Sequence, residues 1–301
     1  MCRRGVHAYL RGRREGNATA EDLFAALSEA SGRDVSGPFS SFVSQPGVPL
    51  VEVTPRCEGE QGSLALRQSR YLPLGSSASP DARWQIPFCA RYHAGGEVRT
   101  TCTLLTETEG TVALEGGCAD WVMPNAGGVG YYRWTLPAEA LATLRRRGLS
   151  ELDIRETLSF ADSIEAGFEA GRISFPDAMA ALSPFARRTE RTLAVAPMGL
   201  AELAIEHYLD DDASRDRARR WAVRLYRDPL RTLGWTPRAN ETPETAIYRE
   251  RLLTFLAMIA EDRVVRNDAA DRGRAYLGLR GDEQIHQDAV AADLAHHPEA
   301  V

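Results

Sequence analysis

The chain has 301 residues, a mass of 33.1 kDa and a formal net charge of −6 at pH 7. Hydrophobic residues make up 44% and charged residues 26%, as in ordinary globular proteins, which excludes disordered, collagen-like and disulfide-scaffold chains. The acidic balance argues against nucleic acid and anionic membrane surfaces as partners, and the length suits two or three domains better than one.

The cysteines indicate neither a disulfide framework nor a zinc ribbon. They are odd in number and none forms a C-x-x-C pair; they are Cys2, Cys57, Cys89, Cys102 and Cys118. We therefore expect a reducing compartment and a cytoplasmic location by default, which a signal or anchor upstream of this sequence would change. No apolar run approaches the roughly 20 residues of a membrane helix, so we expect no membrane segment.

The opening 47 residues predict three short helices. Apolar residues at helical spacing form the first, which ends before Gly16. Thr19 with Asp22 indicates a capping box for the second, and a third covers residues 36–43 before the turn at 45–47. So short a helical piece could hardly bury its apolar face by itself, so we interpret it as the remnant of a larger domain.

Alternating apolar and polar residues begin at Pro49 and predict strands. The expected strands cover residues 48–58, 63–72, 84–92, 98–105, 111–114 and 131–134. Their short, regular spacing, with Gly, Ser and Pro between them, favours a small antiparallel β-sandwich over residues 48–136.

After Pro137 the periodicity becomes helical and stays so until near the end of the chain. Ser150 with Asp153 indicates a capping box for a helix that runs toward Gly167. Further helices are expected at residues 175–182, 200–209, 213–226 and 245–260. Consecutive helical pairs of this kind can stack as a solenoid, although no clean fixed-period repeat is present.

Two segments carry a resemblance to a known family. The first covers residues 5–53 and includes Tyr9-Leu10, Asn17-Ala18 and the turn Ser44-Gln45-Pro46-Gly47. The second is Trp121-Val122-Met123-Pro124-Asn125, followed by Gly130-Tyr131-Tyr132-Arg133. In this order they resemble the aminopeptidase N family of zinc metallo-aminopeptidases. The first looks like the end of that family's catalytic domain and the entry to its sandwich, and the second like its junction between sandwich and helices.

The resemblance implies an α+β multidomain fold. Residues 1–47 would be the C-terminal helices of a thermolysin-like catalytic domain, 48–136 the β-sandwich, and 137–301 an α-helical domain of the HEAT or armadillo superhelix type, whose completeness stays open. It also implies that the intact enzyme holds zinc, which polarises a water for attack on the first peptide bond of a peptide substrate.

The zinc motif of such enzymes is missing from this sequence. H-E-x-x-H places two histidines four residues apart on one helical face, and no two histidines here have that spacing; they are His7, His93, His207, His286, His296 and His297. The family's other catalytic motifs precede the position equivalent to Met1. We therefore expect no catalytic, cofactor-binding or metal-ligating residue in this chain, and activity only when it is joined to the missing catalytic half.

Several local patterns admit a functional and a structural interpretation. His207 with Asp211 could be two metal ligands, but without a third ligand we favour a surface helix pair. His296-His297 is interpreted as a polar tail. Cys89 and His93 share a strand face and could form a zinc cluster with Cys102 and Cys118, but we favour small buried side chains in a reduced core.

The Asn125–Gly130 run resembles a phosphate loop, yet an aromatic strand rather than a helix follows it, so we interpret it as a glycine turn. Arginine clusters occur at residues 145–147, 187–188 and 217–220. Acidic residues accompany them, so solvated helix faces with local ion pairs are favoured over a basic binding face.

Two other functions are weighed against the aminopeptidase part. One is a stand-alone scaffold that binds a peptide or protein on the concave face of its helical array. The other is an unrelated hydrolase that uses residues such as Ser40, Ser41 and His7, although no nucleophile-elbow motif supports it.

Overall fold

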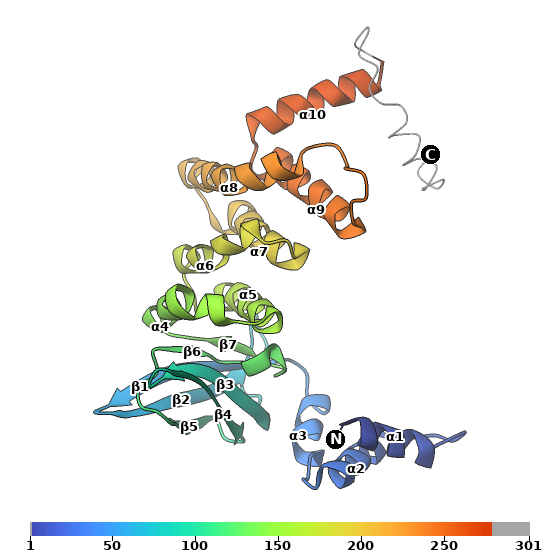
Figure 1. Ribbon diagram of the computed structural model, residues 1–301, viewed down its shortest axis with the longest axis vertical. Coiled ribbons are helices and arrows are strands. Elements are labelled where there is room, and N and C mark those ends of the chain that lie inside the picture. The colour runs from blue at the N-terminus through green and yellow to red at the C-terminus, as the bar shows by residue number, and fades with distance from the viewer. Residues whose placement is uncertain (1, 279–301) are drawn as a thin grey trace. The chain divides into compact units, whose positions relative to one another are not determined.

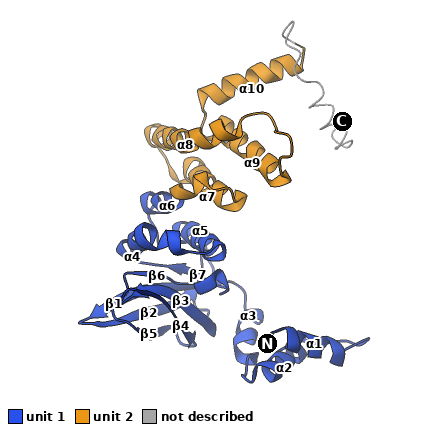
Figure 2. Cartoon of the chain, in the orientation of Figure 1, with its two compact units in different colours: residues 1–182 blue, residues 183–301 orange. Residues whose placement is uncertain are grey.

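The computed structural model describes residues 2–278 (Figure 1). The chain divides into two compact units, residues 1–182 and 183–301 (Figure 2). Helices and sheets both occur, which confirms the α+β class. Among residues 2–278, no helix combines the length and the apolar character needed to cross a bilayer.

Three short helices open the first unit: α1 (Cys2–Gly12), α2 (Ala20–Ser31) and α3 (Ser36–Val43). The predicted capping box of α2 is confirmed, because Thr19 accepts from the Asp22 amide and the Asp22 side chain accepts from the Thr19 amide. Gly32 then ends α2 with a φ of 68°, a left-handed conformation that glycine adopts without strain.

These three helices bury little of their own surface. Of their residues only Gly5 and Phe24 are buried. Two hydrogen bonds attach the α3 end of the segment to the strand region. The Gln85 backbone amide donates to the Ser41 hydroxyl at 3.1 Å, and the Gln45 side-chain amide donates to the Arg83 carbonyl at 2.8 Å.

Within the described residues 2–278, seven strands form two sheets, and the bounds are β1 (Pro49–Glu58), β2 (Gln61–Arg70), β3 (Ile86–Ala94), β4 (Glu97–Leu105), β5 (Glu109–Leu114), β6 (Trp121–Met123) and β7 (Arg133–Thr135). One sheet has the order β5-β2-β1-β7 and the other the order β4-β3-β6. The prediction of a purely antiparallel arrangement is wrong at one place, since β7 pairs with β1 in parallel.

Period-two alternation along the strands places one face of each sheet in the core. On β3, Phe88, Ala90 and Tyr92 are buried while the residues between them are half-buried. Trp84 and Trp134 have 0% exposure and belong to the same core. Aromatic side chains are thus prominent among the buried residues of the strand region.

Four of the cysteines form two disulfides, Cys57–Cys118 and Cys89–Cys102, which corrects the prediction of reduced, buried thiols. Cys57 and Cys102 are exposed and Cys89 and Cys118 are half-buried, so none of the four is a buried thiol of the core. The register places Cys89 directly opposite Cys102, with the two Cα atoms 4.1 Å apart. Spacing along the sequence cannot reveal such an opposition, because it depends on strand register.

The first unit ends with α4 (Ala138–Thr143), α5 (Ile154–Glu169) and α6 (Phe175–Leu182). The predicted cap of α5 is displaced by three residues. Asp153 is the N-cap and Glu156 completes the capping box, whereas Ser150 lies in a preceding 3-10 turn, Leu149–Glu151. Both Ser and Asp can cap a helix, so composition alone leaves this choice open.

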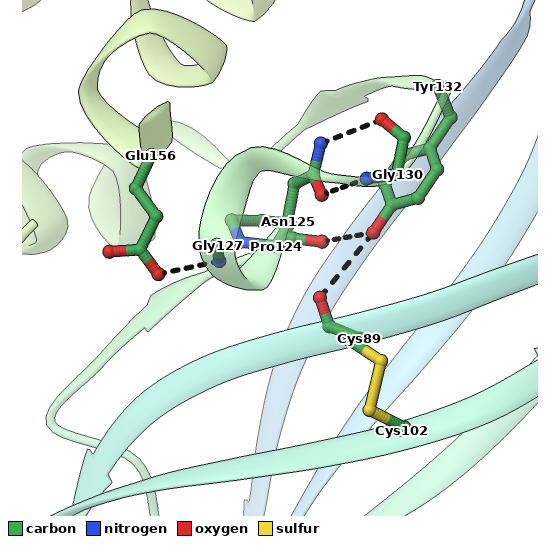
Figure 3. Close-up of a disulfide and its surroundings, with 8 residues drawn as sticks. All are labelled: Cys89, Cys102, Pro124, Asn125, Gly127, Gly130, Tyr132 and Glu156. Carbon is green, nitrogen blue, oxygen red and sulfur yellow. Dashed lines mark hydrogen bonds between the residues drawn. A yellow bond between two sulfur atoms is a disulfide. The ribbon is translucent and has the colours of Figure 1, made fainter. Parts of the chain in front are cut away.

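The Asn125–Gly130 run is a turn, as predicted (Figure 3). Gly127 and Gly128 have φ values of 66° and 60°, which favour glycine. The Asn125 side chain closes the turn, because it accepts from the Gly130 amide at 2.8 Å and donates to the Gly130 carbonyl at 3.0 Å.

Glu156 of α5 joins the helix to this turn and to β3. Figure 3 shows its hydrogen bond with the Gly127 amide. Glu156 is 1% exposed, and its carboxylate accepts from the amides of Gly127 at 3.0 Å and Asp153 at 3.1 Å. Arg91 on β3 pairs with it at 3.0 Å. Both oxygens of the buried carboxylate therefore have a donor, as a buried charge requires.

The second unit contains α7 (Arg191–Leu203), α8 (Asp212–Leu233), α9 (Pro243–Thr254) and α10 (Arg263–Tyr276). Tyr226 of α8 lies at its centre with 0% exposure, donates to the Ala194 carbonyl at 2.8 Å and stacks edge-on against Phe255. The helix α8 is longer than predicted because it continues through Pro229.

Glu165 on α5 is a half-buried carboxyl group with an unusual protonation equilibrium. Burial, and secondly the negative charge of Glu169, raise its pKa to about 7, although Arg133 opposes this. Glu169 itself accepts a hydrogen bond from the Tyr71 hydroxyl at 2.5 Å. The charged form of Glu165 is therefore disfavoured in the folded protein.

We expect Glu165→Gln to stabilise the first unit at pH 8 by about 1–2 kcal/mol. The folded pKa is near 7 and the ordinary value is 4.5, so folding takes up a proton between these values and the wild-type stability falls as pH rises through this window. Urea unfolding followed by circular dichroism at a series of pH values measures the effect. Glu250→Gln, at an exposed glutamate of α9, serves as the control. If the stability difference between the wild type and Glu165→Gln is the same at pH 8 as at pH 5, the raised pKa of Glu165 is contradicted.

Candidate functional site

The structure offers no metal centre among the residues it describes. Within residues 2–278, no group of three or more His, Cys, Asp or Glu side chains is placed to hold a metal ion. The zinc cluster weighed for Cys89, Cys102 and Cys118 is wrong, because all three belong to disulfides. His296 and His297 lie outside the described residues.

His207 and Asp211 do not share one helix, which corrects the predicted helix pair. The helical segment ends at Tyr208, and Asp211 is the N-cap of α8, where it accepts from the Ser214 amide at 2.8 Å. The i, i+4 spacing is therefore interrupted by a helix start, a role that aspartate commonly fills.

His93 lies on the same face of β3 as Cys89, as predicted. Its Nδ1 atom is 2.7 Å from the Asp120 carboxylate, and its ring stacks on Trp121. Arg147 lies 3.7 Å from the other Asp120 oxygen. A groove passes these residues, and neither a serine nor a cysteine is among its lining residues, so the pair does not assemble with a serine or thiol nucleophile there.

The serines of the hydrolase alternative have structural roles. The Ser41 hydroxyl donates to the Pro38 carbonyl at 2.7 Å and accepts from the Gln85 amide at 3.1 Å. The Ser40 carbonyl accepts from the Ser44 hydroxyl at 2.6 Å, as expected inside a short helix. A serine nucleophile needs a histidine base within hydrogen-bond reach, and neither serine shows this arrangement.

A pocket of about 510 Å³ in the second unit is the candidate site that combines apolar and charged lining residues. Its walls come from the 3-10 turn Ser183–Arg187, the C-terminal end of α8, the loop over residues 234–242 and the start of α9. Ala186, Pro229 and Leu233 give it an apolar lining, and arginines surround them. This size suits a small organic ligand rather than a folded partner.

Arg249 fixes the loop that forms one wall of the pocket. It is 4% exposed, and its guanidinium pairs in a bidentate manner with Glu241. It also donates to the carbonyls of Gly234 at 3.1 Å and Leu233 at 3.5 Å. This hydrogen bonding lowers the pKa of Glu241 below its ordinary value.

Tyr248 lines the pocket and has a hydroxyl group without a partner. The oxygen is buried, and no described residue accepts or donates a hydrogen bond there. Burial raises the pKa of this phenol to about 12, so it stays protonated near neutral pH and keeps a donor to offer.

The predicted local ion pairs occur in two of the arginine clusters, where Arg188 pairs with Glu190 and Arg219 with Asp216. Arg147 and Arg187 instead pair with Asp120 and Asp228, which are distant in the sequence. The sequence gives no sign that Arg187 and Arg188 share a pocket with Tyr248, because some 60 residues separate them and only helix packing brings them together.

A family model described as "ERAP1-like C-terminal domain" matches residues 121–294. The chain belongs to this family. The match begins at Trp121, the first residue of the second resembling segment, and covers β6, β7 and the helices α4 to α10, but not α1 to α3. The resemblance to the C-terminal part of the aminopeptidase N family is thereby confirmed.

The curated relatives that the chain matches are named as aminopeptidases. The chain is 25% identical over 261 residues to the puromycin-sensitive aminopeptidase of Caenorhabditis elegans, which covers 85% of this chain and 27% of that protein. It is 25% identical over 296 residues to aminopeptidase M1 of Arabidopsis thaliana, covering 93% and 33% respectively. For aminopeptidase N of Lactococcus lactis subsp. lactis the identity is 23% over 262 residues, covering 84% and 29%. The chain thus spans about a third or less of the length of these relatives.

We expect Arg249→Met to destabilise the second unit of this ERAP1-like domain. The change leaves Glu241 and two loop carbonyls without their donor, which should lower the unfolding midpoint by about 10 °C or more. Arg249→Lys should recover only part of the loss, because an ammonium group cannot form the bidentate fork. Thermal unfolding by circular dichroism measures both, and an Arg249→Met variant as stable as the wild type would show that the clamp does not hold the loop.

Proposed function

We propose that this chain acts as the C-terminal portion of a zinc-dependent aminopeptidase, which removes N-terminal residues from peptides only when the catalytic half is present. The family match and the aminopeptidase relatives support the enzyme class. The absence of H-E-x-x-H from the sequence supports the dependence on a catalytic half. Zinc would belong to that half and not to this chain.

The exposed apolar residues of α1 and α3 are the observation that carries this proposal. Val6, Leu10, Phe39 and Val43 are exposed by 37%, 62%, 42% and 66%. Amphipathic helices normally cover such residues against a neighbouring element. In this proposal residues 1–47 are the end of the catalytic domain, and the catalytic half is the partner that covers these apolar residues.

The remaining residues would serve as architecture. We propose that residues 48–136 form the sandwich domain and 137–301 the helical domain of a HEAT- or armadillo-like superhelix, which supplies a wall and an access path for peptides. The two sheets and the run of helices α4 to α10 are compatible with this division. No catalytic residue is assigned to the chain.

An activity comparison tests the proposal. The purified 301-residue chain, supplied with zinc, should not hydrolyse aminoacyl p-nitroanilides. The native protein, precipitated from its source cells with an antibody against this chain, should hydrolyse them, lose activity to a zinc chelator and regain it with zinc. Hydrolysis by the purified chain, or an inactive precipitate, would refute the proposal.

The alternative is a stand-alone scaffold that binds a peptide or protein without hydrolysing it. The pocket of the second unit is the observation that favours a binding role. A native species of 33.1 kDa that binds a partner and lacks peptidase activity would support this alternative over the first.

A further inference from the structure

The pocket of the second unit carries an excess of positive charge. Its lining has four arginines and three carboxylates, and their direct ion-pair partners outside the lining add two arginines and one glutamate. The total is six arginines against four carboxylates, an excess of two positive charges. The whole chain has a net charge of −6, so this local excess runs against its overall balance.

The carboxylates of the lining are already engaged. Asp228 is shared between Arg187 at 2.9 Å and Arg231 at 3.0 Å, so one negative charge serves two guanidinium groups. Glu241 pairs with Arg249, and Glu244 with Arg191 outside the lining.

Arg238 is the lining arginine that forms no salt bridge with a carboxylate among residues 2–278, although its charge helps to lower the pKa of Glu241 in the same lining. Its guanidinium donates to the carbonyl of Thr232, and further N–H groups stay available. Together with the shared Asp228, this leaves donors around the pocket that an incoming oxyanion would satisfy.

The Tyr248 side chain lines the same pocket. Its buried hydroxyl has no partner within the described part of the chain, and a buried donor left unpaired is costly. An acceptor oxygen on a ligand would remove that cost. The apolar groups of Ala186, Pro229 and Leu233 add surface against which a hydrocarbon group can pack.

We propose that this pocket binds a small organic oxyanion, a carboxylate or phosphate monoester that carries a ring or short aliphatic group. The oxyanion contacts Arg238 and the Tyr248 hydroxyl, and the hydrocarbon part lies against the apolar lining. Arg249 holds the wall in place before binding, which limits the entropy lost when the ligand binds. The site is separate from the peptidase assignment and does not depend on it.

Isothermal titration calorimetry on the full chain tests the site. The probes are phenyl phosphate, phenylacetate, inorganic phosphate and neutral benzyl alcohol, each at about 0.15 M salt so that unspecific attraction is screened. We expect saturable binding of phenyl phosphate or phenylacetate, weaker binding of inorganic phosphate, and none of benzyl alcohol. The tighter of the first two identifies the preferred oxyanion.

Two variants tie the binding to this pocket. Arg238→Gln should weaken it about tenfold or more and Tyr248→Phe about threefold or more, because each removes a donor to a charged acceptor. Arg220→Gln, at an exposed arginine outside the lining, should leave it unchanged. Arg238 is itself exposed, so its replacement should preserve the fold.

Two results would overturn the proposal. One is the lack of saturable binding of both aromatic anions at concentrations up to about 10 mM. The other is equal binding by the wild type, Arg238→Gln and Arg220→Gln, since the anions would then bind to surface arginines in general. Neither result bears on the aminopeptidase proposal, which is tested by zinc-dependent hydrolysis.

Discussion

The buried carboxylate of Glu156 is the interaction on which the arrangement of the first unit depends. It accepts from the Gly127 and Asp153 amides and pairs with Arg91, so one side chain joins the glycine turn, the start of α5 and strand β3. At 1% exposure it cannot exchange these donors for water. Losing the Arg91 guanidinium or the Gly127 amide while Glu156 stays buried would leave the carboxylate short of donors, which is strongly destabilising.

Much of the fold could be predicted from interactions between residues that are close in the sequence. The predictions that were wrong concern contacts between residues that are distant in the sequence. The capping box of Thr19 is a contact between neighbours in sequence, and it is confirmed. The parallel pairing of β7 with β1 depends on which strands meet in space, and the sequence pattern is the same for either direction. The Cys89–Cys102 disulfide likewise depends on register, so the count and spacing of cysteines gave the wrong prediction.

The pocket was beyond sequence reasoning for the same reason. Arg249 and Tyr248 are adjacent on α9, yet their interactions differ. Arg249 pairs with Glu241 of the loop, whereas the Tyr248 hydroxyl has no partner among the described residues. This difference depends on how the helices pack, which the sequence pattern does not reveal. The lack of a zinc motif, by contrast, is legible in the sequence, because H-E-x-x-H requires neighbours on one helical turn. The chain therefore belongs to the ERAP1-like C-terminal domain family, and we assign no catalytic residue to it.

The central claim is that this chain works as one part of a larger zinc aminopeptidase, and the mass of the native gene product tests it most directly. The polypeptide is detected in its source cells with an antibody against this chain, and its intact mass is measured together with that of any firmly bound partner. The account predicts a polypeptide or complex far heavier than 33.1 kDa that contains an H-E-x-x-H segment. A free species of 33.1 kDa without such a partner would contradict it.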